Sequence, residues 1–449
     1  MRLKRPSRSW ARMGRAIQTW GGFALGHHAL TLREVLMRHH TLPVSPATVH
    51  WGYFSKAVAP ALTVRSGDRA TIETLTHHAG DDYDRMIAGD PGAESVFRWV
   101  QGEKAITRRG AGPVEAPFVR GAGEGLGVHL LTGPVAVEDA EPGDILEVRI
   151  LDVRPRPCCH AEHAGRCFGS NAAASWGFHY QDLIEEPKPR EVITIFELDT
   201  AGEPFARAVY NYVWTPQTDP DGIVHPTIDY PGVLVDHRTI QRRERILPNV
   251  KVPARLHFGT MGLAPAEMDF VSSIPPGYTG GNIDDWRIGK GARMYYPVAV
   301  AGAYFSVGDP HAAQGDSELG GTAIETSLTG DFQFILHKAR DLGGTPLEGL
   351  THPMLETDRH WSVYGFTYPN YLAALGPNAQ TDIVQHSSLD KAMRDAFRKL
   401  RRFLMTVHRM SEDEAIALMS VAADFGVTQV VDANWGVHGS IRKDIFTAS

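Results

Sequence analysis

The sequence has few cysteines and no long apolar run. Three cysteines in 449 residues are too few for a disulfide framework, and this scarcity predicts a reducing, cytoplasmic environment. No stretch approaches the roughly 18 consecutive apolar residues that a membrane-spanning helix needs. The basic N-terminus lacks the apolar core of a signal peptide, so export is only the alternative prediction. We therefore expect a protein without a membrane partner.

Several functional signatures are also missing. No Gly-x-Gly-x-x-Gly follows a predicted strand into a helix, and neither a Gly-x-x-x-x-Gly-Lys-Ser loop nor a Gly-x-Ser-x-Gly elbow occurs. Nucleotide binding and serine-hydrolase chemistry therefore have no support. A formal net charge of -7 likewise gives no indication of a nucleic-acid partner.

Glycine and proline are abundant instead, with 45 and 29 residues spread along the chain. This composition favours a β-rich fold with many turns, and a chain of this length needs more than one core. We predict an N-terminal arm at 1–39, a β-rich domain at 40–250, and a second β-rich segment at 251–449 that carries the chemistry. The second segment ends in an α+β part, because helical spacing and capping residues appear at 388–410 and 411–425, before a final strand and turn.

The segment 280–325 is the richest in chemically useful side chains. Its middle, residues 295–307, is apolar and rich in β-branched and aromatic residues, which predicts one or two buried strands. The polar ends are then predicted to be loops at strand ends, where functional residues commonly lie. A carboxylate, an imidazole two residues later and further carboxylates form a donor set suited to a metal ion. The polar residues are Asn282, Asp284, Asp309, His311, Gln314, Asp316, Glu318 and Glu325.

Three further places have two interpretations each. Residues 77–86 gather histidines and aspartates; we expect a solvated loop, and the alternative is that one of them joins a distant site. Residues 158–167 gather cysteines and histidines; we expect an irregular loop with incidental thiols, and the alternative is a metal site. His257 is either a structural residue or a site residue, since Gly259 and Gly262 allow close backbone approach beside it.

Several separate stretches resemble the acetamidase/formamidase family. They cover most of residues 40–449, and SVGDPHAAQGDSE is the most specific block. The resemblance implies a mainly β fold with β-sandwich or barrel units, a smaller α+β part and C-terminal helices. The stretches are HLLTGPVAVEDAEPGDILEVRILDV at 129–153, HFGTMGLAP at 257–265, GGNIDDW at 280–286, PVAVAGAYFSVGDPHAAQGDSELGGTAIE at 297–325, and the tail at 411–441.

The chain also departs from the family pattern. Ser317 and Asp139 stand where the pattern has glycine, Phe258 stands at a proline position, and Arg442 replaces a proline in the last turn. Residues 155–190 match poorly. The acidic and histidine positions are kept, so the resemblance implies the chemistry and leaves the substrate open.

The resemblance implies hydrolysis of the C–N bond of a small linear or cyclic amide to a carboxylate and ammonia or an amine. Amide cleavage needs a nucleophile and stabilisation of the oxyanion, and water on a divalent metal supplies both. We expect zinc, with calcium as an alternative structural ion. The predicted roles are metal binding by Asp309, His311, Asp284 and His129, proton transfer by Glu318 or Glu325, orientation of the amide or water by Asn282 and Gln314, and substrate binding by His257, Gly259 and Gly262.

Two other hypotheses remain at this point. The scaffold could be a non-catalytic protein that binds a small polar ligand, or a metal-free amidase with Cys167 as the nucleophile. We further expect a homodimer or higher homo-oligomer, with a small amide as the only other partner.

Overall fold

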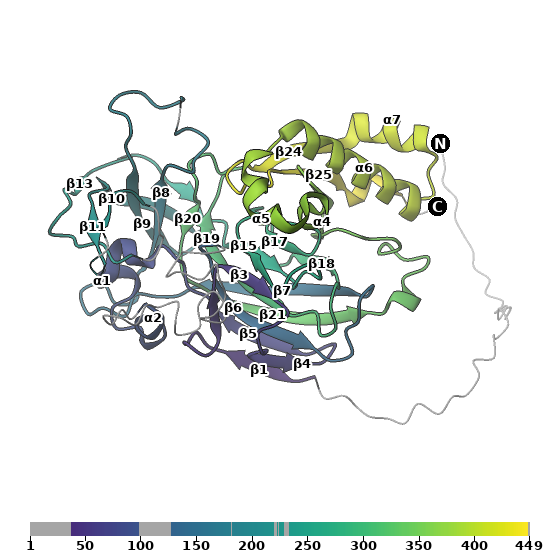
Figure 1. Ribbon diagram of the computed structural model, residues 1–449, viewed down its shortest axis with the longest axis horizontal. Coiled ribbons are helices and arrows are strands. Elements are labelled where there is room, and N and C mark those ends of the chain that lie inside the picture. Colours follow the sequence, from purple (N-terminus) through teal and green to yellow (C-terminus); the bar gives the residue numbers. More distant parts are fainter. Residues whose placement is uncertain are drawn as a thin grey trace, which may run out of the picture. The chain divides into compact units, whose positions relative to one another are not determined.

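The computed structural model describes residues 37–97, 127–180, 182–219, 222, 224–228 and 233–447. All of these residues belong to one compact unit that begins at Met37. Strands dominate, and the longer helices lie near the C-terminus (Figure 1). The predicted mainly β fold with C-terminal helices is therefore confirmed. The predicted arm at 1–39 falls almost entirely outside the described residues.

One large sheet has nine strands in the order β1-β5-β21-β7-β18-β22-β23-β25-β24. Its first pair, β1 with β5, is parallel, and the other neighbours are antiparallel. The strands are β1 (His39–Leu42), β5 (Arg69–Glu73), β7 (Ile145–Pro155), β18 (Arg293–Pro297), β21 (Leu328–His337), β22 (Met354–Glu356), β23 (His360–Phe366), β24 (Ala423–Gln429) and β25 (Gly436–Arg442).

The second large sheet has twelve strands, and its main path is β13-β10-β9-β8-β20-β19-β15-β17. Both large sheets contain strands from either side of residue 250, and the boundary there stays a sequence-level prediction. The strands are β2 (Val49–Trp51), β4 (Leu62–Val64), β6 (Leu130–Val137), β8 (Cys167–Ala173), β9 (Val192–Asp199), β10 (Phe205–Val213), β13 (Arg243–Glu244), β14 (Val252–Pro253), β15 (His257–Gly262), β17 (Gly280–Asn282), β19 (Phe305–Ala313) and β20 (Ile324–Glu325). Two small pairs join β3 (Tyr53–Ser55) to β16 (Phe270–Ser272) and β11 (Gln217–Thr218) to β12 (Val224–His225).

Both predicted C-terminal helices are present. The Ser388 hydroxyl accepts from the Lys391 N–H at the start of α6, and Ser411 forms a capping box with Glu414 at the start of α7. The final strand and turn is a hairpin of β24 and β25, which lies beside α6 (Figure 1). α6 packs on β23 and β25. No helix in the described part of the chain is long and apolar enough to cross a membrane. The helices are α1 (Tyr83–Met86), α2 (Pro91–Val96), α4 (Tyr371–Leu375), α5 (Ala379–Asp382), α6 (Leu389–Val407) and α7 (Glu412–Ala422).

The two large sheets share one apolar core, as in a β-sandwich. Phe332 and Phe334 of β21 meet two phenylalanines of the other sheet. The ring centroids of Phe258 and Phe332 lie 5.3 Å apart, and those of Phe305 and Phe334 also lie 5.3 Å apart. Such pairs contribute about 0.5–1.5 kcal/mol each beyond their buried area. Phe258, at the family's proline position, therefore belongs to the core.

The apolar run 295–307 contributes to two strands, as predicted, but the first part of the polar segment after it, up to Ala313, is strand, and the predicted loop begins only at Gln314. β18 belongs to the nine-stranded sheet and β19 to the twelve-stranded sheet. β19 continues to Ala313, and all nine of its residues are buried. The expectation that Asp309 and His311 lie on an exit loop is therefore wrong. Neighbouring strands β15, β6 and β20 bind β19 and keep this polar segment extended.

The backbone at Asp309 decides which way the polar side chains of β19 point. Side chains alternate along a regular strand, so Asp309 and His311 would face the apolar core together with Phe305. Asp309 instead adopts a left-handed conformation, with φ +50°, and Pro310 lies opposite the core residue Phe258. Irregularities of this kind re-aim side chains beside functional sites. Asp309 and His311 consequently point away from the aromatic core.

Two departures from the family's glycines keep a glycine-like backbone. Ser317 has φ +86° and Asp139 has φ +62°. Aspartate enters the left-handed region more readily than most residues, whereas serine gains less from its side chain there. Backbone hydrogen bonds hold Ser317 in place: its N–H donates to the Thr428 carbonyl at 2.9 Å, and its carbonyl accepts from the Val430 N–H at 3.2 Å.

We predict that Ser317→Gly raises the free energy of unfolding by about 0.5–1 kcal/mol. Relief of about 1–2 kcal/mol of left-handed strain exceeds the roughly 0.5–1 kcal/mol that glycine loses through flexibility of the unfolded chain. Asp139→Gly is the matched control and should gain less. Denaturant unfolding of both variants measures the difference, and a larger gain for Asp139→Gly would contradict the assignment of strain to Ser317.

Candidate functional site

The register of four strands aligns polar side chains in one row. His257 of β15 pairs with His311 of β19, His311 with Glu325 of β20, and Glu325 with Ser170 of β8. Residues directly opposite one another in neighbouring strands project to the same face of a sheet. The sheet therefore brings together side chains that are far apart in the sequence.

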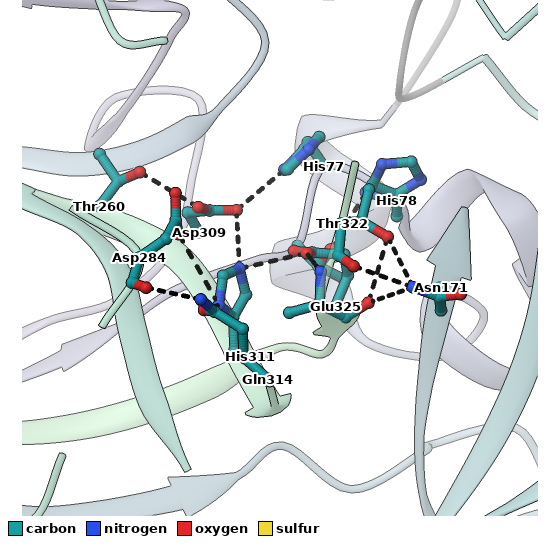
Figure 2. A network of polar contacts seen from close by, with 12 residues as sticks. His77, His78, Asn171, Thr260, Asp284, Asp309, His311, Gln314, Thr322 and Glu325 are labelled. Atoms are coloured by element: carbon teal, nitrogen blue, oxygen red, sulfur yellow. Dashed lines mark hydrogen bonds and ion pairs between the residues drawn. The ribbon is translucent and has the colours of Figure 1, made fainter. Parts of the chain in front are cut away.

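Asp309 lies among imidazole groups (Figure 2). Its Oδ1 is 3.3 Å from the His311 Nε2 and 3.7 Å from the His77 Nδ1, and its Oδ2 is 3.7 Å from the His129 Nε2. The His311 Nε2 is also 3.1 Å from the Glu325 Oε1. All five side chains are buried. Nitrogen and carboxylate oxygen atoms from four segments thus converge on one point.

Neighbouring groups fix the orientation of two of these rings. The His129 Nδ1 is 2.8 Å from the Ser273 hydroxyl. The His311 Nδ1 is 3.1 Å from the His257 Nε2 and 3.2 Å from the Gln314 Oε1. In both rings the Nε2 is left facing Asp309. Partners of this kind commonly orient imidazoles that bind metal ions.

A cavity of about 280 Å³ opens beside Asp309. Most of the predicted site residues line it, and His311 and Gln314 lie behind that lining. Its polar lining consists of His77, His78, His129, Asn282, Asp284, Asp309, Glu318, Thr322, Glu325 and Asp432. The remaining lining residues are Gly127, Val128, Trp176, Ile274, Gly321 and Val431.

Residues 77–86 do not form the solvated loop that we expected. Both histidines of this segment line the cavity, and its first two aspartates are buried because other strands supply their partners. The Ser170 hydroxyl donates to Asp81 at 2.5 Å, and the Tyr210 hydroxyl donates to Asp82 at 2.5 Å. The alternative interpretation, in which this segment joins a distant site, agrees with the geometry. The paired histidines were the available signal, but a solvated loop can have the same composition.

Asp432 was not singled out in the sequence. It lies between β24 and β25, where it is buried beside Asp284 in the cavity. Burial, and then the charge of Asp284, raises the pKa of Asp432 and that of Glu318 well above their ordinary values. Burial, and then Asp309, raises the pKa of Asp284 to about 7. These carboxyl groups oppose one another's ionisation, and a bound cation would relieve that repulsion.

Asp309 and His311 are shifted in the opposite sense. Burial raises the pKa of Asp309, but His129 and His311 lower it more, so the net pKa lies well below its ordinary value. Burial lowers the pKa of His311, but Glu325 and Asp309 raise it well above its ordinary value. Each of the two groups therefore favours the charged form of the other.

The donor atoms fit a divalent metal ion. Groups of three that could hold an ion are His77–His129–Asp309, Asp284–His311–Glu318 and Asp309–His311–Glu325. Zinc bonds of about 2.0–2.2 Å place tetrahedral ligand atoms about 3.3–3.6 Å apart, and the Asp309 oxygens lie 3.3–3.7 Å from the three imidazole nitrogens. A buried polar atom without a partner costs about 1–3 kcal/mol. The buried atoms that lack a hydrogen-bond partner include His77 Nδ1, His311 Nε2, both Asp284 carboxylate oxygens and Glu325 Oε2.

The residues predicted to bind substrate lie behind this layer. His257 contacts His311 and Gln314, and does not line the cavity. A Cβ atom on Gly259 would overlap Asp284, Asp309 and His311, so glycine leaves the space that these side chains occupy. A Cβ atom on Gly262 would meet the backbone of β17. Their substrate-binding role stays a prediction, and their contacts favour positioning of other groups.

The cysteine-rich segment lies elsewhere. None of the candidate ion-binding groups among the described residues includes a member of residues 158–167. Cys167 is buried in β8, does not line the cavity, and has its pKa raised to about 11 by burial. A thiol that stays protonated is a poor nucleophile. The Cys167 hypothesis therefore has no geometric support.

Comparison with known proteins identifies the class of this chain. Residues 126–273 and 268–448 match the Acetamidase/Formamidase family, and the chain belongs to it. It is 31% identical over 219 residues to an acetamidase from Mycolicibacterium smegmatis, covering 42% of this chain and 49% of the relative. It is 29% identical over 217 residues to a formamidase from Methylophilus methylotrophus, covering 43% and 47%. The chain thus spans about half the length of these curated relatives.

Solved structures support the same fold. An acetamidase from Bacillus halodurans aligns with 91% of this chain and 98% of its own, with a TM-score of 0.57 and 20% identity. An acetamidase from Yersinia enterocolitica aligns with 91% and 93%, with a TM-score of 0.58 and 20% identity. At this identity the likeness concerns the fold alone.

We predict that Gly259→Ala lowers the amount of metal bound by the purified protein at least about tenfold. The new methyl group displaces the side chains of Asp284, Asp309 and His311, and a misplacement of about 1 Å can cost about 100-fold in function. Gly315→Ala is the control, because its Cβ would meet no atom within 4 Å. Elemental analysis after metal loading compares the two. Equal metal content in both variants would contradict the role of Gly259.

Proposed function

We propose that this chain hydrolyses the C–N bond of a small amide to give a carboxylate and ammonia or an amine. The main support is that three buried histidines, His77, His129 and His311, surround Asp309 beside a cavity lined by further carboxyl groups. Membership of the Acetamidase/Formamidase family and the names of the two curated relatives agree with this reaction.

The donor chemistry favours a zinc ion in this cavity. Among the ligands predicted from the sequence, Asp309 forms one candidate group with His77 and His129 and another with His311 and Glu325. Mixed imidazole and carboxylate donors suit zinc, whereas calcium prefers oxygen ligands. When bound, such an ion would polarise the amide carbonyl and lower the pKa of a water molecule. Asp284, the fourth predicted ligand, belongs to a neighbouring group with His311 and Glu318.

The polar groups around the ion divide into holding and reacting roles. Thr260 donates to the Asn282 Oδ1 at 2.5 Å, which leaves the Asn282 amide nitrogen as a donor for the substrate carbonyl oxygen. Both ends of Gln314 are engaged: its Nε2 donates to the Asp284 carbonyl at 2.5 Å and its Oε1 faces His311. Gln314 therefore orients the site instead of holding the amide.

Glu318 is the better placed of the two predicted proton carriers. The Glu325 Oε1 is engaged by His311 at 3.1 Å and by the Ala323 N–H at 3.0 Å, and only its Oε2 lacks a hydrogen-bond partner. The Glu318 side chain lines the cavity, and its backbone is left-handed, with φ +50°. Residues at functional sites often have such strained backbone conformations. Once a bound cation favours its ionised form, Glu318 would take a proton from the attacking water and give it to the leaving nitrogen as the C–N bond breaks.

We predict that Asp309→Asn and His311→Ala each lose more than about 100-fold in metal affinity and in amide turnover, because each removes a ligand whose supporting contacts alone are worth about 10–100-fold. Cys167→Ser is the control and should keep both properties. Metal content and ammonia release measure the two effects. Retention of both properties by either ligand variant would refute the ligand assignment, and loss of turnover in Cys167→Ser would revive the thiol hypothesis.

Removal of the metal separates catalysis from simple ligand binding. We predict that chelation abolishes ammonia release from formamide and acetamide, and that zinc restores it, because the proposed reaction needs the ion to activate water. Formamide and acetamide are chosen because the two curated relatives are named for them and because each contains the amide C–N bond. A non-catalytic binding protein would release no ammonia in either state. Release that is unaffected by chelation, with metal confirmed absent by elemental analysis, would exclude the metal-dependent reaction.

The cytoplasmic location and the homodimeric or higher state remain predictions from the sequence. A small amide is the proposed partner.

A further inference from the structure

The cavity has a polar floor and an apolar rim. The histidines and carboxyl groups that line it are all buried. Its four apolar lining side chains are each partly exposed, which places them nearer to solvent. These four are Val128, Trp176, Ile274 and Val431. A ligand that places a polar head on the floor must therefore pass its remaining atoms between apolar walls.

Trp176 is held firmly in this rim. Its indole N–H donates to the Gly321 carbonyl at 3.0 Å. Gly321 has φ +108°, and a Cβ atom there would lie 2.6 Å from the Trp176 ring. A Cβ atom on Gly177, the next residue, would overlap the carbonyl oxygen of Gly320. Two close backbone approaches and a hydrogen bond thus fix the indole beside the cavity, so its position is built into the fold.

Part of the floor and the Trp176 wall come from different kinds of sequence. Asn282, Asp309 and Glu325 of the floor lie in stretches that resemble the family. Trp176 lies within residues 155–190, where the resemblance is weak. Trp176 therefore forms a wall of the cavity outside the stretches that carry the resemblance.

The size of the cavity exceeds the needs of the shortest amides. Its volume of about 280 Å³ approaches the roughly 300 Å³ at which pockets for drug-sized ligands begin. Formamide or acetamide would contact the floor and leave the apolar rim without a partner. An acyl chain of several carbons would cover Trp176 and Ile274 and remove their exposed surface from water.

We infer that the substrate is a primary amide with an apolar acyl group longer than acetyl, such as a straight chain of about six carbons. The inference rests on the proposed function. Water adds its oxygen to the acyl carbon, the C–N bond breaks, and ammonia leaves with a proton from that water. The carboxamide lies on the polar floor, and the acyl chain lies between Trp176, Ile274 and the two valines.

The test compares kcat/KM for ammonia release from formamide, acetamide, butyramide and hexanamide with zinc-loaded full-length protein. We expect a rise of up to about fourfold per methylene group, the factor that corresponds to about 0.8 kcal/mol for each buried CH₂. A fall in kcat/KM from acetamide to hexanamide would overturn this inference and leave the proposed function intact. No ammonia from any amide, with zinc bound, would overturn both.

Two variants locate the effect. Trp176→Ala should lower the ratio of kcat/KM for hexanamide over acetamide at least about tenfold, since an aromatic wall of this size is lost. Phe178→Ala is the matched control: Phe178 is 42% exposed, packs on Trp435 and does not line the cavity, so the ratio should not change. If Trp176→Ala fails to fold, the kcat/KM values of the unchanged protein for the four amides still test the preference for a longer acyl chain. An unchanged ratio in folded, zinc-loaded Trp176→Ala would overturn the inference that the acyl chain lies against Trp176.

Discussion

Five carboxyl groups and three imidazoles line one buried cavity, and a low-dielectric interior tolerates such a set only when the charges compensate one another. Asp309 does so by forming a charged pair with His311, which lies behind the cavity lining, while Asp284, Glu318 and Asp432 repel one another and resist ionisation. Several nitrogen and carboxylate oxygen atoms in the same cluster have no hydrogen-bond partner, so the charges and polar atoms of the cluster are only partly compensated. A divalent cation is the simplest group that satisfies both the charge and the free donors.

The β-sandwich provides the rigidity that this cluster needs. Phe258, Phe305 and Phe332 pack on one side of the twelve-stranded sheet, and the polar row of His257, His311 and Glu325 lies on the other. One left-handed residue in β19 separates these two uses of a single strand. The same few residues therefore complete the apolar core and aim the site, so substitutions that change the backbone there affect folding and chemistry together.

The floor of the cavity and the wall that Trp176 forms are held in place differently. The floor side chains are buried and lie within short contacts of one another. The position of Trp176 depends on a hydrogen bond to the Gly321 carbonyl and on the absence of a side chain at Gly321. A substitution at Trp176 can therefore alter this wall without displacing the floor, which separates substrate preference from reaction type.

The sequence alone determined the β-rich class, the two C-terminal helices and the cluster of acids around His311, because periodicity, capping residues and composition are local properties. It could not place Asp309 and His311 within a strand, since a polar segment stays extended in a core only when neighbouring strands bind both of its edges. It also missed Asp432 and treated residues 77–86 as solvated. The burial of Asp81 and Asp82 in that segment depends on Ser170 and Tyr210, which distant strands supply. Tertiary register alone decided which of many polar residues meet at one point.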